Sequence, residues 1–347
     1  MLSLPGILAL AAFAVTAALV PVVMRIAKRT GFLDHPGPRK IHAQPMPYGG
    51  GIAVAVGTLA AALAGALLGP LREVPRPLLV YALGSLVIVA LGLVDDRRKL
   101  SAAFKLAVET IVALGVALGG QRLELFDTGP VIGTAATVLW ILAVTNAFNL
   151  LDHMDGLSSG VAAIASLAFL VVAFQTNQPG LAEPLGALLG ACAAFLLFNF
   201  PPARIFLGDA GSLFLGFWLS CLTISFTFYE RGHFALYTYF VPVAVLAVPL
   251  FDTAVVTLIR IAQGRPLFEG DRNHLAHRLL ALGLSPRRTV LTVYALTLYA
   301  GLSAVLLYQV KGLAGAVLLL SQLLLTFAII TLLEMTGRQE KPGGQAP

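Results

Sequence analysis

The sequence predicts an all-α, polytopic membrane protein with about 11 transmembrane helices. Of its 347 residues, 58% are hydrophobic and 12% are charged, and its mean hydropathy is +0.87, whereas soluble domains carry about a quarter charged residues. A helix needs roughly 20 apolar residues to cross a bilayer. Such stretches, separated by short polar breaks, lie near residues 3–24, 50–70, 78–94, 102–120, 130–147, 159–175, 183–200, 212–229, 237–260, 289–308 and 313–333.

The first stretch is expected to remain as a transmembrane helix and not to be removed as a signal peptide. No Lys or Arg precedes it, and three cations follow it, which reverses the charge order of a signal peptide. When the polar gaps are assigned alternately to the two sides, 18 of the 23 Lys and Arg fall on one side, and the other side keeps Arg72, Arg76, Arg122, Arg231 and Lys311. Cytoplasmic loops carry the excess of Lys and Arg, so we expect the N-terminus outside and the C-terminus in the cytosol.

The domain organisation, the net charge and the two cysteines indicate one membrane domain without a disulfide framework or a cysteine metal site. We expect a single integral domain over residues 1–335 and a short flexible cytosolic tail over residues 336–347. The formal charge of +6 is explained by membrane topology and does not indicate nucleic-acid binding. Cys192 and Cys221 both lie in apolar stretches without metal-ligand spacing, so they are interpreted as packing residues.

Polar residues gather at the ends of the predicted helices on the cytosolic side. Asp95 and Asp96 come directly after the third apolar stretch. Adjacent carboxylates repel one another, so they either share a cation or one of them keeps its proton. The alternative is a solvated helix end at which Arg97 and Arg98 neutralise both acids.

The break after the fifth stretch carries four polar residues at a spacing of three, namely Asn146, Asn149, Asp152 and Asp155. If this segment is helical, all four lie on one face. Charges at membrane depth are costly and usually face a functional cavity. The alternative is a hydrogen-bonded contact between two helices.

Two further acids belong to the later cytosolic breaks. Asp209 stands between glycines in Gly208-Asp209-Ala-Gly211-Ser212, where it can act as a metal ligand or simply cap the eighth helix. Asp252, in the ninth stretch, is either a site residue or the buried partner of a neighbouring helix.

The loop after the ninth stretch contains His274, His277 and Arg278, whose spacing lets all three project from one helical face. Because carboxylates are plentiful and no cysteine ligand is near, a hard, oxygen-binding ion is favoured over zinc. Histidine with arginine suits a phosphate-rich anion. The alternative is a basic loop that sets the topology and touches anionic lipid.

Together these clusters supply carboxylates for a divalent cation and basic groups for phosphate, which is what phosphoryl transfer requires. In this combination the chain resembles the polyprenyl-phosphate N-acetylhexosamine-1-phosphate transferases, of glycosyltransferase family 4. Four motifs carry the resemblance: Asp95-Asp96, Asn149-Leu-Leu-Asp152-His-Met-Asp155-Gly156-Leu157, Gly208-Asp209-Ala-Gly211-Ser212 and His274-Leu-Ala-His277-Arg278.

Two branches of that family compete. Arg39-Lys40-x-His42-x-x-Pro45-x-Pro47-x-Gly49-Gly50 and the His274 motif look like the undecaprenyl-phosphate N-acetylglucosamine-1-phosphate transferases. The alternative, phospho-N-acetylmuramoyl-pentapeptide transferase, would show a His-His-His run that is absent from this sequence. Ala276 stands where the N-acetylglucosamine-1-phosphate transferases often have a histidine, so the identity of the transferred sugar is not decided by the motifs.

The resemblance implies transfer of an N-acetylhexosamine 1-phosphate from a UDP-sugar to undecaprenyl phosphate, with release of UMP. It further implies a bacterial inner-membrane enzyme with a cytosolic active site, compatible with a homodimer, and direct attack by the lipid phosphate is favoured over a covalent intermediate. The cofactor would be Mg²⁺, with Mn²⁺ as an alternative, held by Asp209 and Asn149. Asp95, Asp96, Asp152 and Asp155 would be the catalytic carboxylates, and substrates would be bound by Lys105, Asn146, His274, His277 and Arg278.

A cation-coupled secondary transporter is the rival from another class, since it also needs acids within helices. Glu109 is the main residue that this interpretation could claim. Most of the acids instead gather at the cytosolic helix ends, and no inverted repeat is evident, so the sequence favours the enzyme.

Overall fold

A computed structural model describes residues 3–35, 44–69, 74–123, 129–226, 240–266 and 274–307, together with a few residues between 314 and 328. The chain divides into two compact units, Met1–Tyr229 and Glu230–Pro347, each of which is considered by itself. The predicted single domain over residues 1–335 stays a prediction. The predicted tail, residues 336–347, and the loop residues Arg39, Lys40 and His42 lie outside the described residues.

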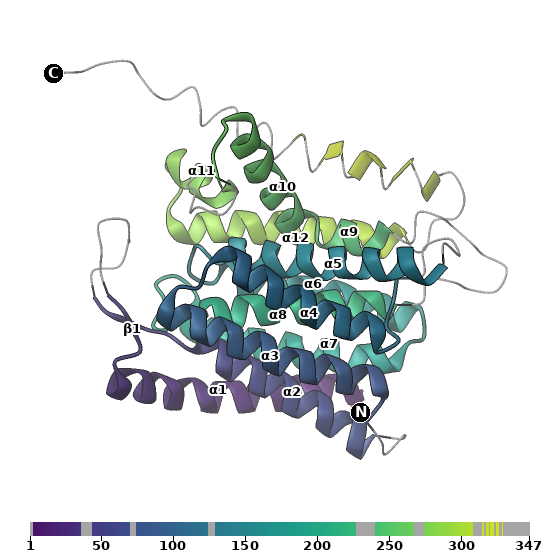
Figure 1. The fold of residues 1–347 in the computed structure, drawn as a ribbon, viewed down its shortest axis with the longest axis horizontal. Coiled ribbons are helices and arrows are strands. Elements are labelled where there is room, and N and C mark those ends of the chain that lie inside the picture. The colour runs from purple at the N-terminus through teal and green to yellow at the C-terminus, as the bar shows by residue number, and fades with distance from the viewer. Residues whose placement is uncertain are drawn as a thin grey trace. The chain divides into compact units, whose positions relative to one another are not determined.

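The first unit is a bundle of eight described helices (Figure 1). A two-stranded antiparallel pair that the hydropathy pattern did not predict, β1 (Leu33–Asp34) and β2 (Met46–Pro47), joins the first two helices. The helices are α1 (Leu4–Thr30), α2 (Gly50–Leu68), α3 (Arg76–Arg98), α4 (Ala102–Leu118), α5 (Gly129–Leu151), α6 (Leu157–Gln175), α7 (Pro179–Asn199) and α8 (Gly208–Ile224).

Helix α8 is the most enclosed element of this unit. It packs against α2, α3, α5 and α6, and Asp209 is the one residue of α8 that is not buried. Glycines allow the neighbouring helices to approach its first turn closely. A Cβ atom at Gly92 of α3 would collide with the backbone of Ala210, and one at Gly51 of α2 would collide with the backbone of Gly211. The first turn of α8 is therefore fixed against two helices.

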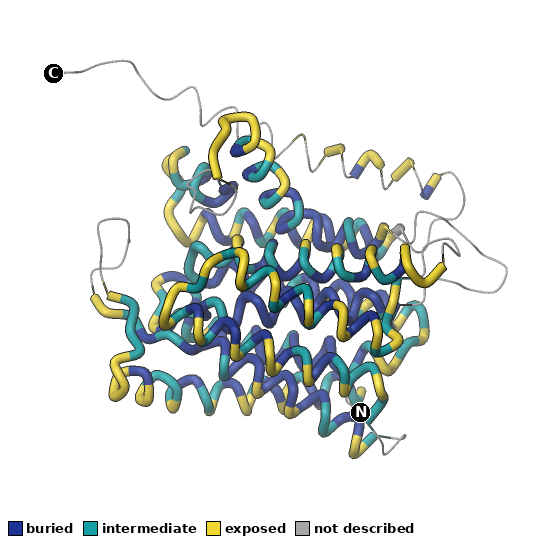
Figure 2. The backbone as a smooth tube through the Cα atoms, in the orientation of Figure 1, coloured by how far each residue is buried: buried dark blue, intermediate teal, exposed yellow. Residues whose placement is uncertain are grey.

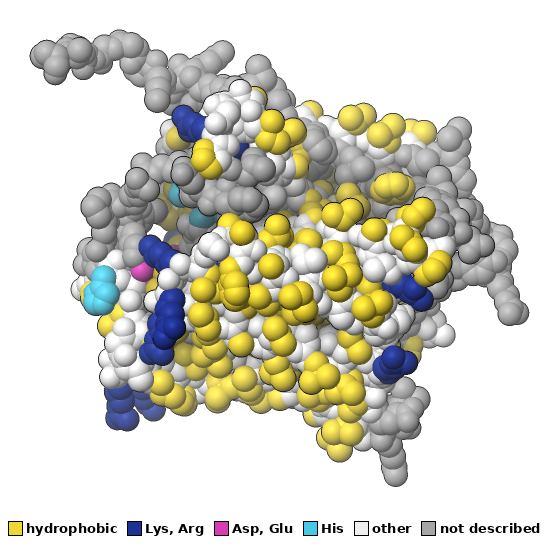
Figure 3. All heavy atoms as spheres, in the orientation of Figure 1, with side chains coloured by type: hydrophobic (Ala, Val, Ile, Leu, Met, Phe, Trp, Pro, Cys, Tyr) yellow, Lys and Arg dark blue, Asp and Glu magenta, His cyan; other side chains and the backbone are white. Residues whose placement is uncertain are grey.

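The surface of the first unit matches a membrane protein. Large apolar side chains of α3 and α4, such as Leu83, Leu86 and Ile111, are exposed. Figure 2 shows buried and exposed positions alternating along these helices. Apolar side chains cover this face, with Lys and Arg confined to its margins (Figure 3). Within the described residues of both units, seven helices are long and apolar enough to cross a bilayer, and six of them belong to the first unit. The prediction of an all-α polytopic membrane protein is thus confirmed, and the number of 11 spans and the orientation stay predictions.

Several helices of the first unit extend beyond their apolar stretches, and two of these extensions carry predicted site residues. Helix α3 continues to Arg98 instead of ending near residue 94, and α5 continues to Leu151 instead of residue 147. Hydropathy marks where apolar residues stop, whereas a helix continues as long as its backbone hydrogen bonds are made. As a result, Asp95, Asp96, Asn146 and Asn149 all lie on helices.

The second unit contains α9 (Val241–Val245), α10 (Ala247–Ala262), α11 (Leu275–Ala281) and α12 (Pro286–Leu307). The prediction of one continuous helix over residues 237–260 was wrong, because the helix is interrupted at Leu246. Pro249 has no N–H to donate to Val245, and its ring would crowd that carbonyl in a regular helix. Most of the predicted last span, residues 313–333, lies outside the described residues.

Candidate active site

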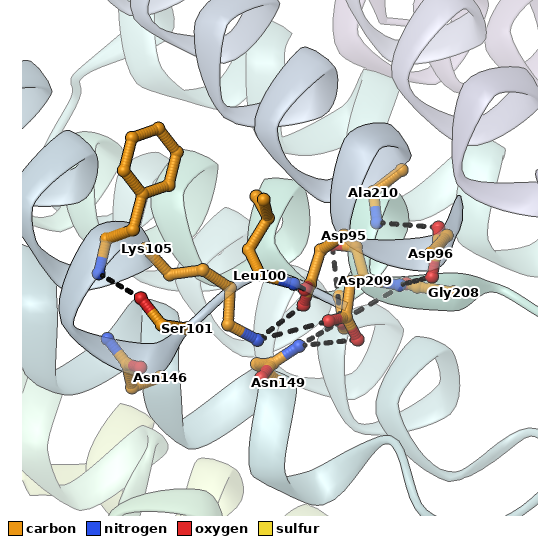
Figure 4. Close-up of polar contacts among 12 residues, drawn as sticks. Asp95, Asp96, Leu100, Ser101, Lys105, Asn146, Asn149, Gly208, Asp209 and Ala210 are labelled. Atoms are coloured by element: carbon orange, nitrogen blue, oxygen red, sulfur yellow. Dashed lines mark hydrogen bonds and ion pairs between the residues drawn. The ribbon is translucent and has the colours of Figure 1, made fainter. Parts of the chain in front are cut away.

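Four helix ends meet at one end of the first unit and bring several of the predicted site residues together (Figure 4). Asp95 and Asp96 come from the end of α3, Lys105 from the start of α4, Asn149 from the end of α5 and Asp209 from the start of α8. Asp209 lies more than 100 positions after Asp95, Asp96 and Lys105 in the chain, so the convergence is a property of the fold.

Lys105 lies between two carboxylates. Its Nζ is 2.5 Å from Asp95 Oδ2 and 3.3 Å from Asp209 Oδ2. The connection between α3 and α4 produces this arrangement, because Asp95 Oδ1 accepts from the backbone N–H of Leu100 at 2.5 Å and Ser101 caps α4 one turn before Lys105. Asp95 is 7% exposed, Lys105 21% and Asp209 33%. Of the three, Asp209 is the most accessible to a substrate.

Asn149 contacts the other oxygen of Asp209. Its Nδ2 donates to Asp209 Oδ1 at 3.0 Å and to Ser212 Oγ at 3.0 Å. Asp209 is thus held by a cation on one oxygen and by an amide on the other. We name the group of Asp95, Lys105, Asn149 and Asp209 the Asp209 cluster.

Asp96 holds the first turn of α8. Its two carboxylate oxygens accept from the backbone N–H groups of Asp209, at 2.8 Å, and Ala210, at 3.3 Å. A carboxylate at this position satisfies unpaired amides and interacts favourably with the helix dipole. Gly208 has a positive φ of 75°, and a Cβ atom there would lie 2.6 Å from Asp96 Oδ2. Asp96 therefore positions Asp209, and its predicted role as a catalytic carboxylate stays a prediction.

Asp152 and Asp155 lie in the turn between α5 and α6, so the predicted polar face is helical only as far as Leu151. Asp155 Oδ2 accepts from the backbone N–H of Ala203 at 2.9 Å. Burial raises the pKa of Asp152 well above its usual value, and the negative charges of Asp209, Asp96 and Asp155 raise this pKa further. This environment therefore favours the protonated, uncharged form of Asp152 beside the Asp209 cluster.

Asn199 is a structural residue of this region that sequence reasoning did not assign. Its Oδ1 accepts from the backbone N–H of Gly156 at 2.8 Å, and its Nδ2 donates to the carbonyl of Ile205 at 2.9 Å. It thereby ties the turn after α5 to the loop before α8. The available signal was a lone Asn just before Phe200-Pro201-Pro202 at the end of an apolar stretch.

Asn146 points to a different partner from Asn149. Its Nδ2 donates to Glu109 Oε2 at 2.5 Å and to the carbonyl of Leu142 at 3.0 Å. Glu109 is 1% exposed and lies one helical turn after Lys105. The Glu109–Asn146 pair therefore forms a second polar layer between α4 and α5, next to the layer of Lys105 and Asn149. The predicted contact of Asn146 with substrate stays a prediction.

Three predicted residues, His274, His277 and Arg278, belong to the second unit. His274 is the residue before α11, and its Nδ1 lies 2.8 Å from Asp252 Oδ2 of α10. His277 and Arg278 follow within α11. Zinc was disfavoured from the sequence, and in the described part of the chain no three His, Cys, Asp or Glu residues form a group suited to a metal ion.

The oxygen ligands of the Asp209 cluster nevertheless fit Mg²⁺. This ion keeps several waters and is usually bound through one or two carboxylates together with substrate phosphates, so it does not need a complete cage of protein ligands. Asp209 supplies an accessible carboxylate, and Asn149, whose Nδ2 donates to that carboxylate, would offer its Oδ1 to the ion. These are the two ligands that the sequence predicted, and metal binding itself stays a prediction.

Comparison with known proteins supports the resemblance. The model of glycosyl transferase family 4 matches residues 78–227, a range that contains the whole Asp209 cluster. A probable undecaprenyl-phosphate N-acetylglucosaminyl 1-phosphate transferase of Bacillus subtilis is 34% identical over 297 residues, which cover 83% of this chain and 81% of the relative.

Two further relatives come from other organisms. A decaprenyl-phosphate N-acetylglucosaminephosphotransferase of Mycolicibacterium smegmatis is 35% identical over 300 residues, covering 78% of this chain and 73% of the relative. An undecaprenyl-phosphate alpha-N-acetylglucosaminyl 1-phosphate transferase of Thermotoga maritima is 29% identical over 280 residues, covering 81% and 83%. With this identity and coverage, together with the motifs at the ends of α3, α5 and α8, the chain belongs to glycosyl transferase family 4.

Proposed function

We propose that the protein transfers N-acetylglucosamine 1-phosphate from UDP-N-acetylglucosamine to undecaprenyl phosphate or a similar polyprenyl phosphate, with release of UMP. The relatives named above for this transfer cover most of the chain. The observation that carries the proposal is the Asp209 cluster, in which a lysine and an accessible carboxylate are fixed side by side. Phosphoryl transfer depends on such positioning and charge balance.

In this reaction an oxygen of the acceptor phosphate forms a bond to the β-phosphorus of the UDP-sugar. The bond from that phosphorus to the oxygen shared with the α-phosphorus breaks, and this oxygen leaves with UMP. The acceptor phosphate is already largely ionised near neutral pH, so no strong base is required. We therefore favour direct attack over a covalent enzyme intermediate.

Mg²⁺, with Mn²⁺ as an alternative, would be held by Asp209 and Asn149, and when bound it would neutralise phosphate charge during transfer. Lys105 supplies a fixed positive charge for a phosphate oxygen. Asp95 holds Lys105 in place, and Asp96 fixes the backbone that carries Asp209. As the resemblance implies, Asp152 and Asp155 would shape the pocket for the nucleotide and sugar, and His274, His277 and Arg278 would bind diphosphate or sugar.

We place the active site on the cytosolic face of the bacterial inner membrane. Support comes from the distribution of Lys and Arg, since the Asp209 cluster adjoins the cation-rich gap after α3. A homodimer remains compatible with the proposal. The relatives' names favour the N-acetylglucosamine branch over phospho-N-acetylmuramoyl-pentapeptide transfer, and family membership disfavours the transporter.

The test is release of UMP by the purified protein in detergent with undecaprenyl phosphate and Mg²⁺. UDP-N-acetylglucosamine and UDP-N-acetylmuramoyl-pentapeptide are offered in parallel. We expect turnover with the first donor alone. Turnover with the second alone would overturn the branch, and failure with both in folded protein would overturn the proposed donor.

A further inference from the structure

Asp252 joins two helices of the second unit at the start of the motif His274-Leu-Ala-His277-Arg278. It lies within α10, and its two carboxylate oxygens contact the start of α11. Oδ1 accepts from the backbone N–H of Leu275 at 2.7 Å, and Oδ2 lies 2.8 Å from Nδ1 of His274. Asp252 is 4% exposed and the side chain of His274 is 5% exposed. The contact is therefore shielded from water.

The chemistry of these groups determines where the proton of His274 lies. An ionised carboxylate only accepts hydrogen bonds, so the Nδ1 atom that faces it must carry a hydrogen. In the neutral ring Nε2 then has a lone pair and no hydrogen. The same carboxylate also satisfies the first backbone N–H of α11. Two donors thus face residue 252, and only a carboxylate offers each of them an oxygen.

An uncharged residue would not serve both contacts. Asn at position 252 has one acceptor and one donor. If its oxygen still accepts from Leu275, its amide nitrogen faces His274 and requires a bare Nδ1, so the ring hydrogen moves to Nε2. An apolar residue at position 252 would leave the buried N–H of Leu275 without this acceptor.

We infer that Asp252 is a positioning residue that holds His274 in the Nδ1–H tautomer and anchors the first turn of α11, which carries His277 and Arg278. The inference rests on the proposed function in one respect, namely that this motif holds the donor diphosphate. The tautomer itself can be measured without any turnover.

The key variant is Asp252→Asn, which preserves the size of the side chain and reverses one hydrogen bond. We would record ¹⁵N NMR spectra of the imidazoles in histidine-labelled, detergent-solubilised protein, with His274→Gln to assign the signals. Wild-type protein should show hydrogen on Nδ1 of His274, and Asp252→Asn should move it to Nε2. Asp252→Glu, which keeps the carboxylate, should retain the wild-type tautomer.

Steady-state kinetics then connect the tautomer to the reaction. The carboxylate partners of metal-bound histidines typically contribute 10- to 100-fold to affinity or activity. By analogy, Asp252→Asn should lower kcat/KM for UDP-N-acetylglucosamine by about that factor, and Asp252→Glu should recover part of it. Ser285→Ala is the matched control, because it removes a side-chain cap at α12 of the same unit. It should leave kcat/KM within about twofold of wild type.

Each outcome has a distinct meaning. An unchanged tautomer in Asp252→Asn would overturn the inference, as would a changed tautomer with unchanged kcat/KM. If Asp252→Asn does not fold, Asp252→Glu still tests the inference, since hydrogen on Nε2 in that variant would contradict it. If wild-type protein transfers no sugar phosphate, the proposed function fails, whereas the NMR result still decides the tautomer.

Discussion

Replacing Lys105 by Met should separate the structural and chemical roles of the Asp209 cluster. The change leaves Asp95 and Asp209 facing one another without their shared cation, whose Nζ lies 2.5 Å from Asp95 and 3.3 Å from Asp209. Breaking a fully buried ion pair costs about 3–5 kcal/mol of folding free energy. Because 21% of Lys105 and 33% of Asp209 are exposed, water screens part of this effect, and we expect a loss of about 2–3 kcal/mol.

The assay is thermal unfolding in detergent, together with UMP release. A loss of that size should lower the Tm by roughly 5 °C, and turnover should fall by at least about 100-fold. Adding Asp95→Asn removes the repulsion between the two acids, so the double variant should regain stability while staying inactive. Lys28→Met, which removes an exposed cation from the last turn of α1, is the control and should leave both quantities unchanged. A Lys105→Met protein with wild-type Tm and turnover would refute the role given to Lys105.

Three further predictions concern packing and charge. Gly92→Ala should unfold or inactivate the protein, because its Cβ would collide with the backbone of α8. Gly115→Ala on α4, where a Cβ would meet nothing within 4 Å, is the control and should match or exceed wild-type stability. Equal Tm values for the two variants would contradict the close approach of α3 and α8. Asp152→Asn should raise the Tm at pH 8 and change it little at pH 4. The pKa of this carboxyl is raised in the folded protein, so the carboxyl destabilises the fold once the pH exceeds its pKa in the unfolded chain, about 4. An equal change in Tm at both pH values would contradict this. Glu109→Leu should cost about 1–3 kcal/mol of folding free energy, because Asn146 loses one of its two acceptors and keeps only the carbonyl of Leu142. Glu109→Gln should cost clearly less. Urea titration that ranks the two variants the other way would contradict the pairing.

The fold class could be predicted because the bilayer imposes a simple rule on composition. Any helix that crosses it must be apolar for about 20 residues, and this alone located the eight helices of the first unit. The rule says little about helix ends, so α3 and α5 extend further than hydropathy indicates. The break at Leu246 was missed because hydropathy averages over Pro249, whose effect is on backbone hydrogen bonding.

The candidate site could be predicted as a set of residues but not as an arrangement. Asp209, Asn149 and Lys105 stood out because polar groups are expensive in an apolar segment, and topology put them on the same side. Their contacts depend on how α3, α4, α5 and α8 pack. For the same reason the sequence could not show that Asp96 holds backbone amides of α8, or that Asn146 pairs with Glu109. Asp252 was foreseen only as an acid with two alternative roles, and its partner His274 lies 22 residues away.

The most direct test of the account is a Mg²⁺ titration of UMP release, comparing wild type with Asp209→Asn in the presence of UDP-N-acetylglucosamine and undecaprenyl phosphate. Glu183→Gln serves as the control. Asn199 marks the end of α7 that lies near the site, and Glu183 lies 16 positions before it on the same helix, about 24 Å away along the helix. We expect Mg²⁺-dependent turnover in wild type and in the control, and none in a folded Asp209→Asn protein at any Mg²⁺ concentration. Wild-type turnover by Asp209→Asn, or turnover by wild type that does not respond to Mg²⁺ or to a chelator, would contradict a metal-dependent transferase site at Asp209.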